Sequence, residues 1–182
     1  MMRLFTGLEL PSDIGFDLNF MQGGIEGARW IDRESFHITL RFIGDIDDHL
    51  GREVAMAMDE ASVRPFTISL KGIDVFGGNK PHALIARVED NPELNRLQAA
   101  QERICQTLGL GPERRKFIPH VTLARLRDPD PRDLRDFIES HALYRSRPFE
   151  IESFVLFSSK PSRGGGPYAV EETYSAAGAA YA

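Results

Sequence analysis

Short segments rich in β-branched and aromatic residues alternate along the chain with segments whose apolar residues fall on one helical face. The first kind predicts strands over residues 3–10, 36–43, 66–75, 82–88, 117–126, 149–157 and 168–174. The second kind predicts helices over residues 12–21, 47–61, 92–108 and 131–140. The last two helices start with a capping residue followed by proline, Asn91-Pro92 and Asp130-Pro131.

The order of these elements favours an α+β fold over a doubly wound parallel sheet. The strands come in short groups between helices, and a hairpin-like loop at residues 77–81 joins two of them. A chain of 182 residues can bury a core of its own, either as one domain or as two small packed lobes. We therefore expect mainly antiparallel sheets with helices outside them.

One sequence motif occurs twice. His37-Ile38-Thr39-Leu40 recurs as His120-Val121-Thr122-Leu123, and each copy lies in a segment predicted as a strand. An aspartate follows each copy at the same offset, Asp45 and Asp128. Such a repeat indicates a duplication. We predict a single domain over residues 1–182, made of two pseudo-symmetric lobes that carry the motifs at 37–40 and 120–123 and enclose a central cleft.

The spacing inside the motif suits acid–base chemistry. Side chains two positions apart in a strand lie on the same face, so His37 points the same way as Thr39, and His120 the same way as Thr122. Two such strands facing each other would surround one space with two imidazoles and two hydroxyls. Imidazole gives and takes protons near neutral pH, and hydroxyls donate to an anionic oxygen. This set fits cleavage of a phosphate ester; the alternative is that the histidines only serve packing in a duplicated fold.

At these residues the chain resembles the two-histidine (2H) phosphoesterase superfamily. Within it, the chain is most similar to the LigT-like branch of bacterial and archaeal RNA 2′,3′-cyclic phosphodiesterases, also called 2′-5′ RNA ligases. The resemblance extends over nearly the whole chain. The matching segments are the first strand at 3–11, the motif at 37–44, the motif at 119–125, and a terminal hairpin at 154–159 and 166–168.

The resemblance implies a bilobal α+β fold with a central cleft, without a metal or another cofactor. It implies an enzyme that opens a 2′,3′-cyclic phosphate, on an RNA 3′ end or a nucleotide, to a 2′-phosphate. Carried over by position, His37 and His120 are the catalytic pair, and Thr39 and Thr122 bind the phosphate. We assign His120 as the base and His37 as the acid, although the nearly symmetric repeat also allows the reverse.

Two further site residues follow from the resemblance. Arg125 would add a charge-assisted contact, and Phe42 would lie against the base or the ribose. Strict alternation from each histidine puts both residues on the opposite face of their strands, at an offset of five, so a bulge or a strand end must turn them in. Otherwise Phe42 belongs to the core and Arg125 to the solvated surface.

The charge balance bears on the RNA partner. A net charge of −5 argues against a grip on long nucleic acid through many phosphates and favours local contact with a short end. The basic run Arg114-Arg115-Lys116 is either a contact to an RNA backbone or a solvated charge run. The other three histidines lack the motif, and no catalytic role is expected for them: His49, His82 and His141.

The single cysteine, Cys105, allows no intrachain disulfide, and we expect it to be a buried structural thiol. No run of about 18 apolar residues and no secretory signal pattern is present, so the sequence predicts a cytoplasmic protein that does not enter a membrane. Nothing in the pattern sets the oligomeric state, and a monomer is expected.

Three rival hypotheses follow from the same residues. Ligation at a 2′-5′ junction is the reverse chemistry, with an RNA hydroxyl in place of water. A metal site on His37 and His120 would normally bring carboxylates or cysteines at short spacing, and here threonines stand instead. A non-catalytic module that binds RNA ends would not need both histidines, and both are present.

Overall fold

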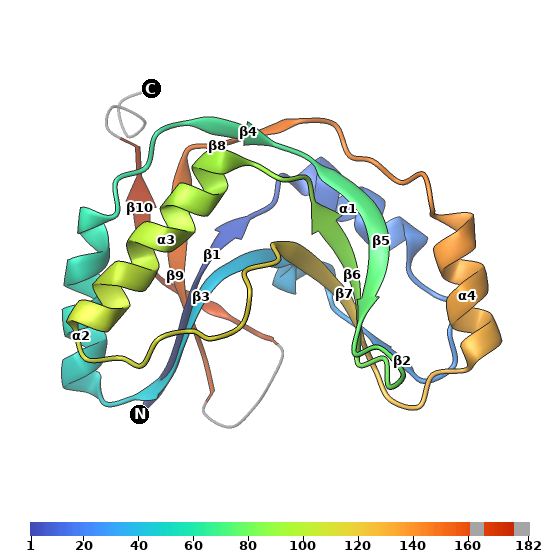
Figure 1. The fold of residues 1–182 in the computed structure, drawn as a ribbon, viewed down its shortest axis with the longest axis horizontal. Helices are drawn as coiled ribbons and strands as arrows, with labels where there is room; N and C mark the ends of the chain where they lie inside the picture. Colours follow the sequence, from blue (N-terminus) through green and yellow to red (C-terminus); the bar gives the residue numbers. More distant parts are fainter. Residues whose placement is uncertain (161–165, 177–182) are drawn as a thin grey trace.

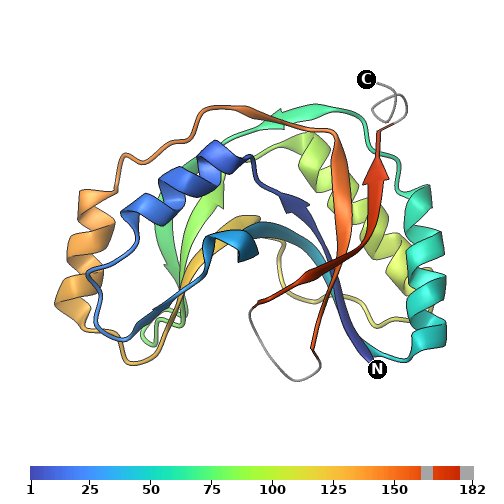
Figure 2. The same cartoon turned by 180° about the vertical axis from the view of Figure 1, so that it is seen from behind.

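The computed structural model describes residues 1–160 and 166–176, which form an arch with an antiparallel sheet at its centre (Figures 1 and 2). The strands of this sheet are β1 (Met2–Glu9), β2 (Ala28–Trp30), β3 (His37–Ile46), β5 (Leu70–Phe76), β6 (Ala83–Val88), β7 (His120–Leu126), β9 (Ser153–Ser159) and β10 (Ala169–Ser175). The helices are α1 (Ser12–Met21), α2 (Asp48–Ala57), α3 (Pro92–Thr107) and α4 (Pro131–Ser140). The predicted α+β class with mainly antiparallel sheet is confirmed.

The helices lie at the two ends of the arch. Figure 1 shows α2 and α3 at one end, beside β1, β3, β9 and β10, and α1 and α4 at the other, beside β5, β6 and β7. The strand order is β10-β9-β1-β3-β7-β6-β5, and β2 pairs with β7. The two motif strands, β3 and β7, are therefore neighbours at the centre of the sheet. They are joined there by one antiparallel pair, Ile38 with Val121.

The helix starts follow from local hydrogen bonding. The side chain of Asn91 accepts from the backbone N–H groups of Glu93 and Leu94, and that of Asp130 accepts from those of Arg132 and Asp133. Apolar side chains from both ends of the arch form one continuous buried cluster against the sheet. The core is thus shared by both halves, and their pseudo-symmetry stays a prediction.

Two of the predicted strands were too long, because the chain passes between two sheets within each of them. The segment 66–75 divides at Ser69 into β4 (Phe66–Ile68) and β5, and the segment 149–157 divides at Glu152 into β8 (Phe149–Ile151) and β9. β4 and β8 pair with each other in a separate two-stranded sheet. The Ser69 carbonyl accepts from the Glu89 N–H at this crossing. Both segments keep a strand-like composition throughout, so composition alone did not reveal the break.

Other differences from the sequence prediction concern element boundaries and short elements. β7 begins at His120 rather than at 117, since Pro119 has no N–H to donate and offers only its carbonyl, which accepts from Val88. The predicted helix at 47–61 ends in a 3₁₀ turn, η2 (Met58–Glu60). The short β2 and the 3₁₀ turn η1 (Arg33–Ser35), which leads into β3, were missed because three residues carry too little pattern.

Each motif strand contains a β-bulge at the same place. Against β1, the register of β3 skips Leu40 between Thr39 and Arg41, and Leu40 and Arg41 are both buried. Against β6, the register of β7 skips Leu123, and Leu123 and Ala124 are both buried. The extra residue reverses the alternation of side chains beyond it.

Behind the bulge of β3 lies a buried cation. The Arg41 guanidinium donates to the Glu102 carboxylate on α3, to the carbonyl of Phe42, and to the carbonyl of Gly111 in the loop that leads to β7. Only 6% of Arg41 is exposed, so the charge depends on these partners. The position equivalent to Arg41 in β7 is Ala124, and the network exists on one side only.

We predict that Gly7→Ala lowers the free energy of unfolding by about 1–3 kcal/mol. Gly7 pairs with Thr39 across the bulge, and a Cβ there would lie 2.8 Å from the Ile38 carbonyl oxygen, a backbone atom that cannot move alone. Urea denaturation would measure the change. Gly51→Ala in α2 is the control: its Cβ would make ordinary contacts at 3.7 Å, and alanine favours the helix, so stability should hold or rise.

If Gly7→Ala is as stable as the wild-type protein, β1 and β3 can move apart at the bulge. That result would contradict the prediction that their close approach requires a glycine at position 7.

Candidate active site

A cavity of about 460 Å³ lies where the two motif strands meet β1, β6 and the loops around them. All six residues singled out from the sequence line it: His37, Thr39, Phe42, His120, Thr122 and Arg125. The β-bulges explain how Phe42 and Arg125 reach the cavity. Phe42 and Arg125, at offset five, turn to the same face as the histidine and threonine of their strand, and both are exposed at that face.

Both imidazoles are oriented in the same way. Nδ1 of His37 lies 2.8 Å from the Ser35 carbonyl oxygen, and Nδ1 of His120 lies 2.7 Å from that of Ile118. A carbonyl oxygen only accepts, so Nδ1 carries the proton in each ring, and Nε2 of a neutral ring holds a lone pair. The carbonyl two residues before each histidine thus fixes its tautomer and leaves Nε2 for proton transfer.

The second nitrogen differs between the two rings. Nε2 of His37 lies 2.9 Å from the Thr39 hydroxyl, which donates to it when the ring is neutral. Among the residues that the structure describes, Nε2 of His120 has no such partner. The two copies of the motif are therefore alike in backbone and unlike in the hydrogen bonding of their rings.

Aromatic side chains surround the His37 ring. Its centroid lies 4.9 Å from the Phe5 ring and 5.1 Å from Tyr168, which meets it edge-on, while His120 meets the edge of Phe76 at 4.7 Å. Burial lowers the pKa of both imidazoles, because it penalises the charged form. Neighbouring charge lowers each pKa further, that of His37 through His120 and that of His120 through Arg87.

The cavity is positively charged although the chain is acidic. Three guanidinium groups line it, those of Arg3, Arg115 and Arg125, and no carboxylate is among its lining residues in the described part of the chain. Arg3 is paired with Asp45 at 3.2 Å, and its guanidinium lies 5.8 Å from the centre of the Phe42 ring. Arg115 is likewise paired with Glu113 at 3.2 Å, whereas Arg125 has no carboxylate partner among the described residues. Arg125 is therefore the guanidinium best placed to bind a phosphate in this cavity.

Several cavity residues were missed by the sequence reasoning, because each comes from an element distant in sequence. Arg3 and Phe5 belong to β1, Phe76 ends β5, and Tyr168 precedes β10. The Tyr168 hydroxyl interacts with Arg125, and burial raises the pKa of this phenol. Tyr168 stands in the terminal hairpin on which the family resemblance rests, and that match was the available signal.

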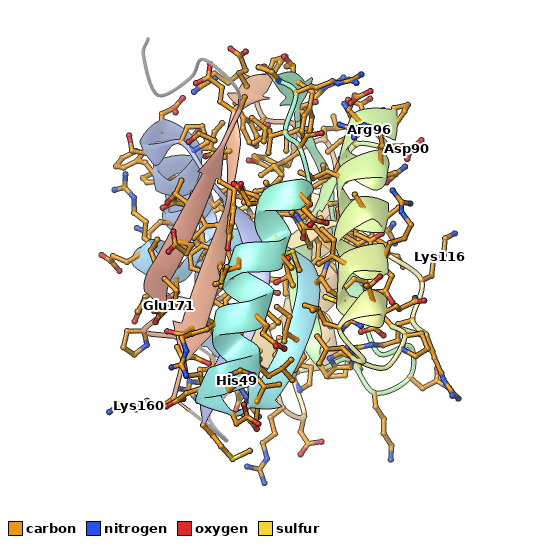
Figure 3. The ribbon with its side chains drawn as sticks, turned by 90° about the vertical axis from the view of Figure 1, so that its left-hand side faces the viewer. His49, Asp90, Arg96, Lys116, Lys160 and Glu171 are labelled. Carbon is orange, nitrogen blue, oxygen red and sulfur yellow. The ribbon has the colours of Figure 1, made fainter. Side chains whose placement is uncertain are left out.

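Of the three remaining histidines, only His82 lines the cavity among the described residues, so the structure gives it a position that its sequence context did not predict. His49 is exposed on α2 beside Glu53 (Figure 3), and His141 follows α4, with Nδ1 donating to the Phe137 carbonyl.

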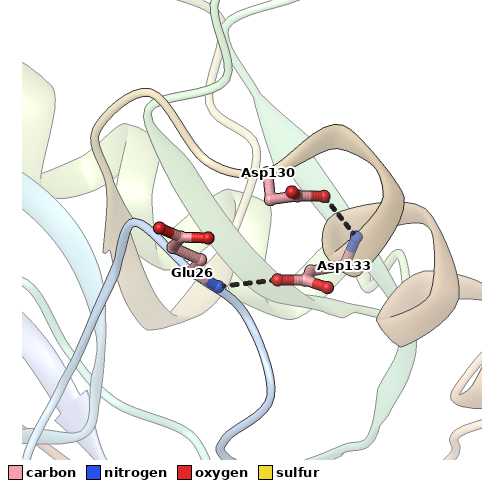
Figure 4. Close-up of side chains that lie close together, drawn as sticks. All are labelled: Glu26, Asp130 and Asp133. Carbon is pink, nitrogen blue, oxygen red and sulfur yellow. Dashed lines mark hydrogen bonds between the residues drawn. The ribbon is translucent and has the colours of Figure 1, made fainter.

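A second groove and a cluster of carboxylates lie outside this cavity, and both fit an anion less well. A groove of about 800 Å³ lies between the loop at 78–81 and α4, and in its lining the carboxylates of Asp128 and Glu139 offset the charges of Lys80 and Arg135. Figure 4 shows Glu26, Asp130 and Asp133 close together. Asp130 caps α4 and Asp133 accepts from the Glu26 N–H at 3.0 Å, so hydrogen bonding at the helix start accounts for this cluster.

The fold and the paired histidine–threonine motifs define the class of the two-histidine phosphoesterases. The family model described as LigT like phosphoesterase matches residues 8–85 and 87–168, and the chain belongs to this family. The resemblance stated from the sequence is thereby confirmed.

Relatives and solved structures agree with this placement. An RNA 2′,3′-cyclic phosphodiesterase of Aquifex aeolicus is 30% identical over 152 residues, 81% of this chain and 81% of that protein. One of Aeropyrum pernix is 35% identical over 99 residues, 53% of this chain and 56% of that protein, so this second match spans about half of the relative's length. A crystal structure of a Thermus thermophilus protein has the same fold, with a TM-score of 0.77 at 24% identity over 96% of this chain and 97% of that chain.

We predict that the imidazoles of His37 and His120 titrate with midpoints below the ordinary histidine pKa of about 6.5. Burial disfavours the charged rings, so the neutral forms persist to lower pH than in an unfolded chain. NMR titration of the ring protons would measure the midpoints, with His37→Gln and His120→Gln to assign them. Inorganic phosphate should raise both midpoints, since an anion in the cavity favours the charged form. Midpoints at or above 6.5 in the free protein would contradict the expectation.

Proposed function

We propose that this protein is an RNA 2′,3′-cyclic phosphodiesterase that opens the cyclic phosphate to a 2′-phosphate by acid–base catalysis. One observation carries the proposal: two imidazoles, each held by a backbone carbonyl with Nε2 left for proton transfer, share a cavity with the Arg125 guanidinium, and no carboxylate is among its lining residues in the described part of the chain. The names of the Aquifex and Aeropyrum relatives support the same activity.

In this proposal His120 is the base and His37 is the acid. Nε2 of His120, which has no partner among the described residues, takes a proton from water as the water oxygen attacks phosphorus. The bond between phosphorus and the 3′-oxygen breaks, and protonated Nε2 of His37 gives its proton to that oxygen. The products are a 2′-phosphate and a free 3′-hydroxyl. The phosphate beside His37 offsets the effect of burial and keeps the acid charged.

The other cavity residues hold the substrate. The hydroxyls of Thr39 and Thr122 donate to the non-bridging phosphate oxygens, and the Arg125 guanidinium adds a charge-assisted hydrogen bond. The Phe42 ring, 41% exposed with Arg3 over it, offers a flat apolar face to the base or the ribose. The proposal requires no metal, and the carboxylates of Glu26, Asp130 and Asp133 share no residue with this cavity.

The compartment belongs to the same proposal. The single cysteine, Cys105, is buried in α3, and burial raises its pKa to about 11, so the thiol is a poor nucleophile. A chain without a structural disulfide suits the reducing cytoplasm. No helix among the described residues is long and apolar enough to cross a membrane.

We predict that His37→Ala and His120→Ala each lower turnover of a nucleoside 2′,3′-cyclic phosphate at least about 100-fold, because a positioned acid or base contributes about 10²- to 10⁴-fold. The assay is run in excess EDTA, with the circular dichroism of each variant as a check on folding. His49→Ala is the matched control, since this exposed histidine lies outside the cavity. Near wild-type turnover in a folded cavity variant would refute the assignment, and activity that EDTA abolishes and a divalent metal restores would favour a metal site.

We predict that a substrate with an activated 3′ leaving group restores most of the lost rate of His37→Ala and little of that of His120→Ala. Such a leaving group departs without a proton, so the acid becomes dispensable while the base is still needed. Single-turnover rates with the natural and the activated substrate decide the roles. Selective rescue of His120→Ala would reverse the roles and leave the two-histidine mechanism in place.

A further inference from the structure

The loop between α3 and β7, residues 108–119, carries the basic run 114–116 and leads from the lower end of α3 back to the centre of the sheet (Figure 1). The structure separates the three cations. Arg115 lines the cavity, whereas Arg114 and Lys116 are exposed and are not among its lining residues. Figure 3 shows Lys116 pointing away from the body of the molecule. The three basic residues therefore do not form one charged surface, and only Arg115 among them lines the cavity.

A chain of contacts from the buried face of the sheet fixes the position of Arg115. Arg41, behind the bulge of β3, binds Glu102 and the Gly111 carbonyl. The other oxygen of Glu102 accepts from the Glu113 N–H at 2.9 Å. The Glu113 carboxylate in turn accepts from the backbone N–H of Arg115 at 3.0 Å and from its Nε at 3.2 Å. The loop is thus anchored at two points close to Arg115.

Arg115 has spare hydrogen-bonding capacity at the rim of the cavity. Its side chain is 82% exposed, and among the described residues its contact to Glu113 uses Nε and leaves the two terminal nitrogens without a partner. The threonine hydroxyls and Arg125, on the same strands as the histidines, are the donors proposed for the phosphate that is attacked, whereas Arg115 lies on a separate loop. A cation at the rim is reached by a part of the substrate that extends out of the cavity.

We propose that Arg115 is a specificity-determining residue, which binds the phosphodiester that links the terminal nucleotide to the one before it and so favours an RNA end over a free cyclic nucleotide. This inference rests on the proposed function. Planar guanidinium groups bind phosphates through paired hydrogen bonds, and anchoring of the loop reduces the entropy lost on binding. A single rim cation also accords with an acidic chain that makes few phosphate contacts.

The test compares kcat/KM for a cyclic mononucleotide with kcat/KM for a dinucleotide that ends in a 2′,3′-cyclic phosphate. Arg115→Ala should lower the value for the dinucleotide about 5-fold at low salt and leave that for the mononucleotide unchanged. Arg115→Lys should restore part of the loss. Lys116→Ala is the matched control: it removes the same charge from the same loop and should change neither substrate.

A change in the substrate provides the second arm. For a dinucleotide with an uncharged methylphosphonate link, kcat/KM of the wild-type protein should equal the value of Arg115→Ala for the natural dinucleotide. Arg115→Ala should not lower kcat/KM for this modified dinucleotide any further. Equal losses for the mononucleotide and the dinucleotide, or no loss for either, would overturn the inference and leave the proposed function standing. A wild-type protein that turns over neither substrate would instead refute the proposed function.

Discussion

The site depends on one extra residue in each central strand. In a regular strand, side chains at even offsets from the histidine would face the cavity, and those at odd offsets would face the core. The bulges at Leu40 and Leu123 send two successive side chains into the core and return the residue at offset five to the cavity. The imidazole, the hydroxyl and the third side chain thus share a face while a closed apolar layer is kept behind them.

The backbone of the two motifs is alike, and their difference comes from the strands that flank them. β1 and the terminal hairpin bring Phe5 and Tyr168 against His37, while β5 and β6 bring Phe76 and Arg87 toward His120. Burial and a neighbouring charge lower the pKa of both rings, and the Thr39 hydroxyl at Nε2 of His37 has no counterpart at His120 among the described residues, so the two rings are unequal. A pair of equal groups needs such inequality if one is to start charged and the other neutral.

The sequence predicted the helices at 12–21 and 131–140 with the bounds observed, because the signals at their starts are local: Pro11 before the first, and the Asp130 cap followed by Pro131 for the second. It also predicted that each histidine shares a face with the threonine of its motif, since this spacing is fixed within a strand, while Phe42 and Arg125 were predicted from the family resemblance. It did not predict where 66–75 and 149–157 change sheets, because both parts of each segment have strand-like composition. Placing Phe42 and Arg125 in the cavity required a bulge in each strand, yet no residue type marks the position of either bulge. Arg3, Phe76 and Tyr168 reach the cavity through sheet order, which a single sequence does not state.

The pair Ile38 and Val121 links the two motif strands, and both are the second residue of their motif. An antiparallel pair generated by a twofold axis joins each position to its own equivalent, which is the relation seen here. Either half alone would present its motif strand as a bare edge, and a bare edge recruits another strand. In one polypeptide, the covalent link holds the partner strand at high effective concentration. Each side of this seam also contains strands from both halves of the sequence, because β9 pairs with β1 and β6 pairs with β7. The chain therefore crosses the seam repeatedly, and assembly of the seam, and of the cavity over it, is independent of protein concentration.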